Sequence, residues 1–219
     1  MLCHMSSVFH VSVDALEFIP GNYIDPLELK DVFPRRPDAL LEADLGCGDG
    51  AFLTARALQH PERNFLGVER LVGRVRRTCR RLFRAEVSNA RVMRVESHYA
   101  IRYLLPPGSA SVVHLMFPDP WPKRRHQGNR LFQCDFLEAV HNVLAPSGEL
   151  RLTTDNAPYF QQMHDIFESH PGFEEKPWCP GEEYPQTDFE RRFRAEGLPI
   201  YRALLRKITR AGETDGGFA

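Results

Sequence analysis

Short apolar runs alternate along the chain with longer stretches in which apolar residues recur every three or four positions. The short runs predict strands at 39–41, 65–68, 91–95, 112–117, 149–153 and 201–208. The longer stretches predict helices at 51–58, 71–87, 100–105, 132–144, 158–169 and 189–195. Strands that alternate with helices in this way are typical of an α/β fold with a parallel, doubly wound sheet.

A glycine-rich loop joins the first predicted strand to the first predicted helix, in the segment 42–50 with the sequence EADLGCGDG. Gly46 and Gly48 let ligand atoms approach the backbone, and the start of the helix offers free N–H groups. Glu69 ends the next strand, where a carboxylate can accept hydrogen bonds from ribose hydroxyls. Together with Ala51 the two glycines also satisfy the looser dinucleotide fingerprint, so a nicotinamide cofactor remains an alternative. The neighbouring acidic residues favour S-adenosylmethionine, because its sulfonium and amino groups tolerate carboxylates that would repel a pyrophosphate.

The segment 117–126, FPDPWPKRRH, follows the strand predicted at 112–117 and contains three prolines. Proline cannot continue a helix or a central strand, so this loop leaves the strand in a fixed, extended shape. Asp119 and Trp121 are therefore predicted at the carboxyl end of a strand, where open α/β sheets bind their ligands. The basic cluster that begins at Lys123 suits an anionic partner.

Basic residues are unevenly distributed although the net charge of the chain is only −1. Five arginines recur at helical spacing along the helix predicted at 71–87 and therefore share one face of it. They are Arg70, Arg74, Arg77, Arg81 and Arg84. This face is either an ordinary solvated surface or a stripe that contacts nucleic-acid phosphates, and the sequence leaves both interpretations open.

Other features limit the class of protein. A chain of 219 residues is long enough for one domain with a proper core. No apolar run reaches the ~18 residues that span a bilayer, and the segment 1–14 lacks the cationic start and apolar centre of a signal peptide. The five cysteines lie far apart, which predicts reduced thiols in the cytoplasm without a disulfide framework or a zinc site. The histidines have no metal-ligand spacing either, so no metal is expected.

With these motifs in this order, the chain resembles the bacterial tRNA (guanine-N7)-methyltransferases over roughly 40–207, and the PDPWPKRRH block is highly specific to that family. The resemblance implies a Rossmann-like class I methyltransferase domain at 35–211, with a doubly wound, mostly parallel, seven-stranded sheet. An N-terminal extension is expected at 1–34 and a disordered tail at 212–219. The implied cofactor is S-adenosylmethionine, and the implied substrate is a guanosine in the variable loop of tRNA. A cytoplasmic monomer or homodimer that binds no membrane is expected.

The resemblance also assigns roles to single residues. Beside Gly46 and Gly48, the acidic cofactor-binding positions are matched by Glu42, Glu69, Glu96 and Asp119. The substrate positions are matched by Lys123, Asp155, Thr187, Asp188, Phe189 and Glu190. Two departures stand out: Glu96-Ser97 replaces the usual Asp-Ala, and 127–129 carries no basic residue where the family tends to have more. Thr187 to Glu190 also forms a capping box, S/T-x-x-E, so helix capping and substrate binding both remain open.

The chemistry implied by this resemblance fits the residues. Guanine N7 carries a lone pair and no proton, so methyl transfer to it needs no general base, and no Ser/His/Asp or Cys/His arrangement is evident. Catalysis should rest on holding N7 in line with the methyl group. Asp119 is the candidate catalytic residue, because a carboxylate stabilises the cationic product. Asp155 is expected to accept hydrogen bonds from guanine N1–H and N2–H. Trp121 either stacks on the base or holds the loop as a wedge.

Two other classes of protein remain open at this stage. One is an amino-group methyltransferase that acts on adenine or on a protein, because a related D-P-P-Y type of loop follows the fourth strand in such enzymes. The other is a nicotinamide-dependent oxidoreductase or an RNA-binding Rossmann-like domain without catalytic activity. The basic continuation of the proline loop argues against the first class, and the carboxylates beside the glycine loop argue against the nicotinamide enzyme.

Overall fold

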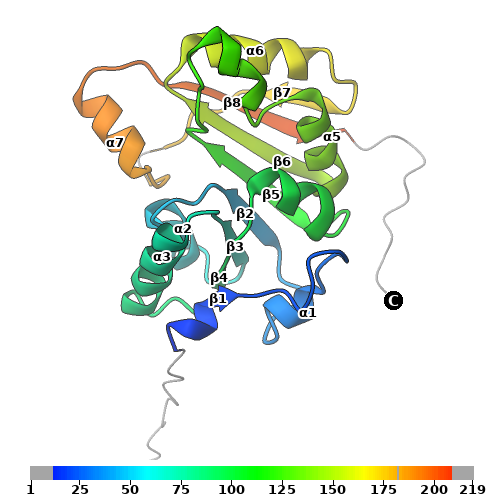
Figure 1. Cartoon of the computed structure of the whole chain (residues 1–219), viewed down its shortest axis with the longest axis vertical. Helices are drawn as coiled ribbons and strands as arrows, with labels where there is room; N and C mark the ends of the chain where they lie inside the picture. Colours follow the sequence, from blue (N-terminus) through cyan, green and yellow to red (C-terminus); the bar gives the residue numbers. More distant parts are fainter. Residues whose placement is uncertain (1–11, 182, 209–219) are drawn as a thin grey trace, which may run out of the picture.

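The computed structural model describes residues 12–181 and 183–208. In this part of the chain eight strands form one sheet in the order β1-β4-β3-β2-β5-β6-β8-β7 (Figure 1). Their bounds are β1 Glu17–Phe18, β2 Leu41–Leu45, β3 Asn64–Val68, β4 Ala90–Met93, β5 Ala110–Met116, β6 Leu144–Thr154, β7 Phe173–Lys176 and β8 Tyr201–Lys207. The tail predicted at 212–219 lies outside the described residues.

The sheet is mostly parallel, as the alternation of strands and helices predicts. Strands β1 to β6 pair in parallel, and only β8 runs antiparallel, to β6 on one side and to β7 on the other. The predicted number of seven strands is wrong, because the described chain has eight. The extra edge strand β1 has only two residues, too few to show an alternation of apolar and polar positions, and β7 with the sequence FEEK is largely polar.

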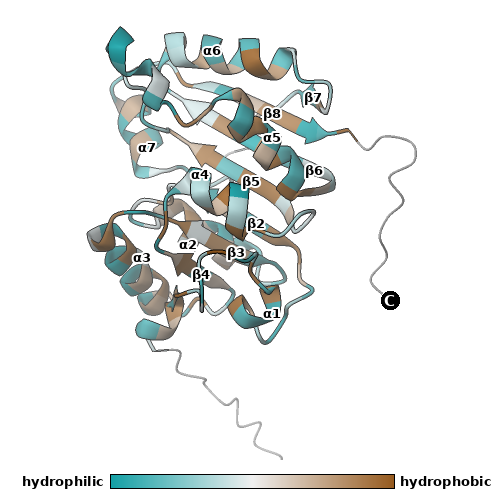
Figure 2. Ribbon diagram, turned by 45° about the vertical axis from the view of Figure 1, so that its right-hand side comes forward, coloured by the Kyte–Doolittle hydropathy of each residue, from teal (hydrophilic) through white to brown (hydrophobic). Residues whose placement is uncertain are grey.

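Helices cover both faces of the sheet. The helices are α1 Leu29–Val32, α2 Ala51–Gln59, α3 Val72–Arg84, α4 Ser97–Tyr99, α5 Cys134–Val143, α6 Ala157–Glu168 and α7 Asp188–Ala195. Three further turns are η1 Asp14–Leu16, the π-helical turn η2 Ala100–Leu104, and η3 Arg124–Asn129. Apolar positions along the central strands lie between helices whose outer surfaces are polar (Figure 2).

Two apolar clusters correspond to the two faces. On one face, Ala43 of β2 belongs to the same cluster as Phe136 of α5 and Met163 of α6. On the other face, Phe65 of β3 packs in a cluster with Leu53 of α2 and Val75 of α3. The sheet is therefore doubly wound, and the loops at the carboxyl ends of its strands lie where the two layers of helices diverge.

The segment that the sequence sets apart as an extension, 1–34, is continuous with the domain in its described part. Phe18 of β1 pairs with Met93 of β4. Leu27, Val32 and Phe33 belong to the large apolar cluster. Residues 12–34 thus add an edge strand and part of the core to the sheet domain. Within the described residues no helix is long and apolar enough to cross a membrane.

Candidate functional site

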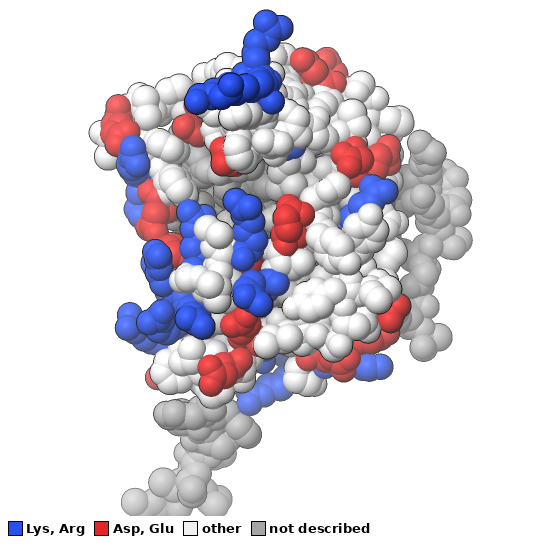
Figure 3. Space-filling view, viewed as in Figure 1, with Lys and Arg blue, Asp and Glu red and all other residues white. Residues whose placement is uncertain are grey.

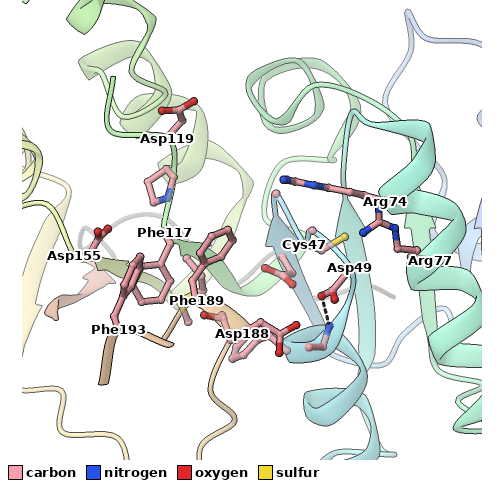
Figure 4. Close-up of a pocket in the computed structure, with 18 of the residues that line it drawn as sticks. Cys47, Asp49, Arg74, Arg77, Phe117, Asp119, Asp155, Asp188, Phe189 and Phe193 are labelled. Carbon is pink, nitrogen blue, oxygen red and sulfur yellow. Dashed lines mark hydrogen bonds between the residues drawn. The ribbon is translucent and has the colours of Figure 1, made fainter. Parts of the chain in front are cut away.

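A cavity of about 550 Å³ opens at the carboxyl ends of β2, β5 and β6 (Figure 4). Its lining comes from the β2–α2 loop, α3, the loop after β5, the end of β6 and the start of α7. The lining residues are Asp44, Gly46, Cys47, Gly48, Asp49, Ala51, Phe52, Arg74, Arg77, Met116, Phe117, Pro118, Asp119, Pro120, Asp155, Thr187, Asp188, Phe189 and Phe193. Figure 4 shows Cys47, Asp49 and Arg74 on one wall and Phe117, Asp155 and Phe193 on the other.

The glycine loop forms one wall of the cavity, and it begins after β2 ends at Leu45. Gly46 has a φ of 76°, in the left-handed region that favours glycine, and a Cβ at this position would enter open space rather than protein. Gly50 has a φ of 78°, and a Cβ there would collide with the side chain of Thr78 on α3. Thr78 Oγ1 also donates a hydrogen bond of 3.0 Å to the carbonyl of Gly48, so α3 holds the loop in place.

Glu42, one of the expected cofactor residues, does not line the cavity. Its side chain is completely buried. It accepts hydrogen bonds from Arg56 Nη2 at 2.8 Å, from Arg63 Nη1 at 2.9 Å and from His114 Nε2 at 2.8 Å. Two arginines and a histidine thus occupy its acceptor sites, so Glu42 stabilises the interior of the sheet instead of facing a ligand.

Asp44 occupies the position that sequence reasoning gave to Glu42. It lies two residues further along β2, on the same face of the strand and at the cavity. Its position along the strand was the available signal. Ligands bind beyond the carboxyl end of a strand, and the last acidic residue of the strand lies nearest to that end. Asp44 Oδ2 is buried and has no hydrogen-bond partner in the described structure.

The surroundings of Asp44 disfavour its charged form. Burial raises the pKa of this carboxyl to about 7, and the nearby carboxylates Glu69 and Glu42 add to the effect. A buried acceptor without a partner is costly, and a cation in the cavity would relieve that cost. The unpartnered oxygen therefore suits the amino group of S-adenosylmethionine, and the glycine loop beside it leaves room for the rest of the molecule.

Of the other three acidic cofactor candidates, Asp119 lines the cavity, whereas Glu69 and Glu96 do not. Glu69 follows β3, is buried, and accepts a hydrogen bond of 2.8 Å from the N–H of Leu71. Its second oxygen lies 3.7 Å from Arg74 Nη1. Glu96 caps α4 and accepts hydrogen bonds from the N–H groups of His98 and Tyr99. Neither assignment is tested by this geometry, and both remain predictions.

The substrate candidates separate into two groups. Asp155 and the start of α7, Thr187 to Phe189, line the cavity together with Asp119. Lys123 and Glu190 do not. Lys123 lies exposed in the loop after β5.

Helix capping accounts for part of the predicted substrate motif. Thr187 Oγ1 accepts a hydrogen bond of 3.0 Å from the N–H of Glu190, which confirms the cap. Glu190 itself is buried and binds Arg194 and Arg202. Its carboxylate therefore does not return to the N-cap as in a full capping box.

Three phenylalanines form an aromatic wall of the cavity, and two of them, Phe117 and Phe193, were not among the predicted site residues. The ring centroid of Phe117 lies 5.5 Å from that of Phe193 and 6.4 Å from that of Phe189. Phe117 has a φ of 51°, an uncommon conformation for a residue other than glycine, and such strain is frequent at functional sites. The i,i+4 spacing of Phe189 and Phe193 on a helix was the available signal. Trp121 does not line the cavity and packs edge-to-face against His126 at 5.9 Å, which favours the wedge interpretation.

The segment between β7 and α7 contacts the sheet and α2 through Tyr184. It is described as residues 177–181 and 183–187. Tyr184 Oη lies 3.2 Å from His114 Nδ1, and its ring packs 5.7 Å from that of Phe52. His114 is buried, and burial lowers the pKa of its imidazole. A neutral imidazole that donates from Nε2 to Glu42 must accept at Nδ1, so the hydroxyl of Tyr184 is the donor.

Known proteins with similar sequences are methyltransferases. A family model described as a putative methyltransferase matches residues 38–203. The tRNA (guanine-N(7)-)-methyltransferase of Alkalilimnicola ehrlichii is 37% identical over 191 residues, which make up 85% of this chain and 80% of the relative. That of Syntrophotalea carbinolica is 36% identical over 180 residues, 80% of this chain and 77% of the relative.

The fold is also that of solved methyltransferase structures. The antibiotic-resistance methyltransferase Kmr superposes with a TM-score of 0.59 at 18% identity, over 84% of this chain and 95% of that chain. The 30S ribosomal A1408 methyltransferase from an uncultured bacterium gives a TM-score of 0.58 at 15% identity, over 84% and 98%. On the strength of the family model and of relatives that match most of its length, the chain belongs to the tRNA (guanine-N(7)-)-methyltransferase family.

Proposed function

We propose that the protein transfers the methyl group of S-adenosylmethionine to N7 of a guanosine in the variable loop of tRNA. The observation that carries the proposal is the composition of the cavity. One wall presents the glycine loop and the unpartnered oxygen of Asp44, and the other presents Asp119, Asp155 and three phenylalanines. Because its substrate would be tRNA, we place the activity in the cytoplasm.

The residues divide the work of binding between the two walls. S-adenosylmethionine, when bound, supplies a methyl group activated by the positive charge on sulfur. We assign Asp44 to the amino group of the cofactor. Glu69, which lies near the wall formed by the glycine loop, is assigned to the ribose hydroxyls of the cofactor. Phe117, Phe189 and Phe193 present flat apolar surfaces on which a base can stack.

The two aspartates on the far wall have different tasks. Asp155 accepts hydrogen bonds from the N1–H and N2–H donors that distinguish guanine from adenine. Asp119 offsets the positive charge that develops on the base as N7 is methylated. No proton leaves N7, so no general base is needed. Holding the base in line for transfer supplies up to about 7–11 kcal/mol of the barrier reduction.

The function is tested by mass spectrometry of nucleosides from tRNA incubated with the protein and S-adenosylmethionine. 7-Methylguanosine should form in a tRNA that carries the variable-loop guanosine and should not form in the same tRNA with adenosine there. Methylated adenine in tRNA or DNA, or a methylated protein without 7-methylguanosine, would favour an amino-group methyltransferase instead.

Cofactor affinity is expected to depend on pH through Asp44. Its pKa of about 7 in the free protein means that binding of a cation displaces a proton below that pH. Affinity should therefore rise with pH up to about 7, by at most about tenfold per pH unit, and level off above it. Calorimetry in buffers of different ionisation enthalpy measures the released proton.

The matched control for this experiment is Asp44→Asn. The ligand's own titration is common to both proteins, so the difference between their pH profiles isolates Asp44. Identical profiles for the two proteins would remove Asp44 from the cofactor site.

Replacing Glu69 is expected to weaken cofactor binding. Glu69→Ala should cost about 1.5–3 kcal/mol of binding free energy, the range for a hydrogen bond to a charged group. Glu69→Gln, which can still accept the N–H of Leu71, should cost less. Glu62→Ala serves as the control, because Glu62 is an exposed glutamate between α2 and β3 that does not line the cavity. Unchanged affinity in a folded Glu69→Ala protein would show that the ribose is bound elsewhere.

A further inference from the structure

A second hollow lies along the exposed side of α3, beside the cavity. It has a volume of about 630 Å³ and is lined by Asp49, Arg77, Arg80, Arg81, Arg84 and Ala85. We call it the arginine groove. Asp49 and Arg77 line both the groove and the cavity, so the two are continuous at the glycine loop. Figure 3 shows basic side chains gathered over α3, in the lower left of the view.

The packing of α3 fixes the direction in which these arginines project. Val75, Cys79 and Leu82 are buried against the sheet. The four arginines of the groove are spaced i, i+3, i+4 and i+7, so they form one continuous strip on the opposite side of the helix. The chain as a whole carries a net charge of −1, and this strip is therefore a local concentration of positive charge.

Ion pairs neutralise only part of the strip. Arg81 Nη2 lies 2.9 Å from Asp49 Oδ2 and also donates from Nε to the carbonyl of Asp49. Within 12–181 and 183–208, no ion pair is found for Arg77, Arg80 or Arg84, and all three are exposed. A merely solvated face of this composition would be expected to carry interspersed acidic residues, whereas α3 carries none.

We propose that the arginine groove binds the ribose-phosphate backbone of the tRNA next to the target guanosine. The proposal rests on the proposed function and extends it from the base to the strand that carries the base. Arg84 follows Arg77 by seven positions, a distance of about 10 Å along the helix that suits two or three successive phosphates. Arg77 lies where the groove meets the cavity, so a strand whose guanine enters the cavity passes directly onto the strip.

The test compares two double variants of the full chain. Arg80→Gln with Arg84→Gln removes two charges that make no ion pair in the described part of the chain and do not line the cavity. Arg102→Gln with Arg206→Gln removes two exposed charges on other elements, of which Arg206 is paired with Glu149, and is the control with the same change in net charge. Binding of fluorescently labelled tRNA is followed by anisotropy over a range of KCl concentrations, and melting temperatures confirm that each variant is folded.

The groove variant should lower the slope of log affinity against log salt by about 2. At 0.1 M salt this corresponds to a loss of about 100-fold in tRNA affinity, which disappears near 1 M. The control variant should keep the wild-type slope. Arg80→Lys with Arg84→Lys retains the charge and should restore most of the slope.

Two results would overturn the proposal. One is an unchanged slope in the folded groove variant, and the other is an equal fall in both double variants, which would indicate a general field instead of a groove. Failure of the proposed function is distinguishable from either. If the wild-type protein forms no 7-methylguanosine, the proposed function is wrong, whatever the salt dependence of the variants. If the wild-type protein is active and the groove variant keeps the wild-type salt slope, only the groove proposal is wrong.

Discussion

Asp155→Ala is expected to remove nearly all methylation of tRNA while leaving cofactor affinity close to that of the wild type. Asp155 follows β6 and lines the wall opposite the glycine loop. Without its carboxylate, two guanine donors lose their acceptor. Hydrogen bonds to a charged group are worth about 1.5–3 kcal/mol each, so kcat/KM should fall about 10²- to 10⁴-fold. Single-turnover methylation of tRNA, alongside calorimetry with the cofactor, measures the two effects.

The counterpart of this variant is Asp119→Asn, which keeps the shape of the side chain and removes its charge. Asp119 is held in the proline loop, where its Oδ1 accepts a hydrogen bond of 3.2 Å from the N–H of Trp121. A neutral amide cannot offset the positive charge that forms on the base, so the rate should fall, and cofactor affinity should fall with it. Loss of cofactor binding in Asp155→Ala with Asp119→Asn unaffected would reverse the two roles.

Glu42→Gln is expected to destabilise the fold more than any other single change considered for this chain. The substitution leaves Arg56 buried without its charged partner, and breaking a buried ion pair typically costs about 3–5 kcal/mol. Urea unfolding followed by circular dichroism measures the loss. Glu62→Gln is the matched control, because Glu62 is exposed and its ion pairs with His60 and Arg63 lie at the surface. That variant should change the free energy of unfolding by no more than about 0.5 kcal/mol.

The pH dependence gives the same prediction a second test. Burial alone would raise the pKa of Glu42, but the hydrogen bond from His114 and the charge of Arg56 hold it well below its usual value of 4.5. A depressed pKa contributes stability that is fully present above the unfolded value and declines as pH falls below it. The advantage of wild type over Glu42→Gln should therefore be constant from neutral pH to about 4.5 and shrink at lower pH. An advantage independent of pH would mean that the charge of Glu42 contributes nothing.

Local patterns were sufficient to predict the main elements. The helices at α2, α3, α5, α6 and α7 lie within a few residues of their predicted bounds, because each has its own apolar stripe and end signals. Edge strands β1 and β7 escaped detection, because a strand of two residues, or one with three charged residues out of four, has no such pattern. Helical spacing also predicted part of the arginine face of α3. Arg77, Arg81 and Arg84 line the groove as one strip, whereas Arg80 was not predicted there and Arg74 lines the cavity instead.

Contacts between distant residues could not be predicted in the same way. Glu42 and Asp44 lie on the same face of β2, and nothing in their local sequence shows that Arg56 and His114 occupy the first of them. Arg81 is separated from Asp49 by 32 residues, and Tyr184 from His114 by 70. Such pairs depend on how the layers of the fold come together, which is information that local periodicity does not contain.

If both hollows bind their proposed ligands, the shared position of Asp49 should make the two binding events thermodynamically dependent on each other. Its carboxylate faces the cavity and is held by Arg81 of the arginine groove. An RNA phosphate that draws Arg81 away from Asp49 changes the charge that a cationic cofactor meets, and the cofactor in turn changes the availability of Arg81. Linkage requires the two effects to be equal in free energy. Bound cofactor should therefore change the affinity for tRNA by the same factor as bound tRNA changes the affinity for the cofactor.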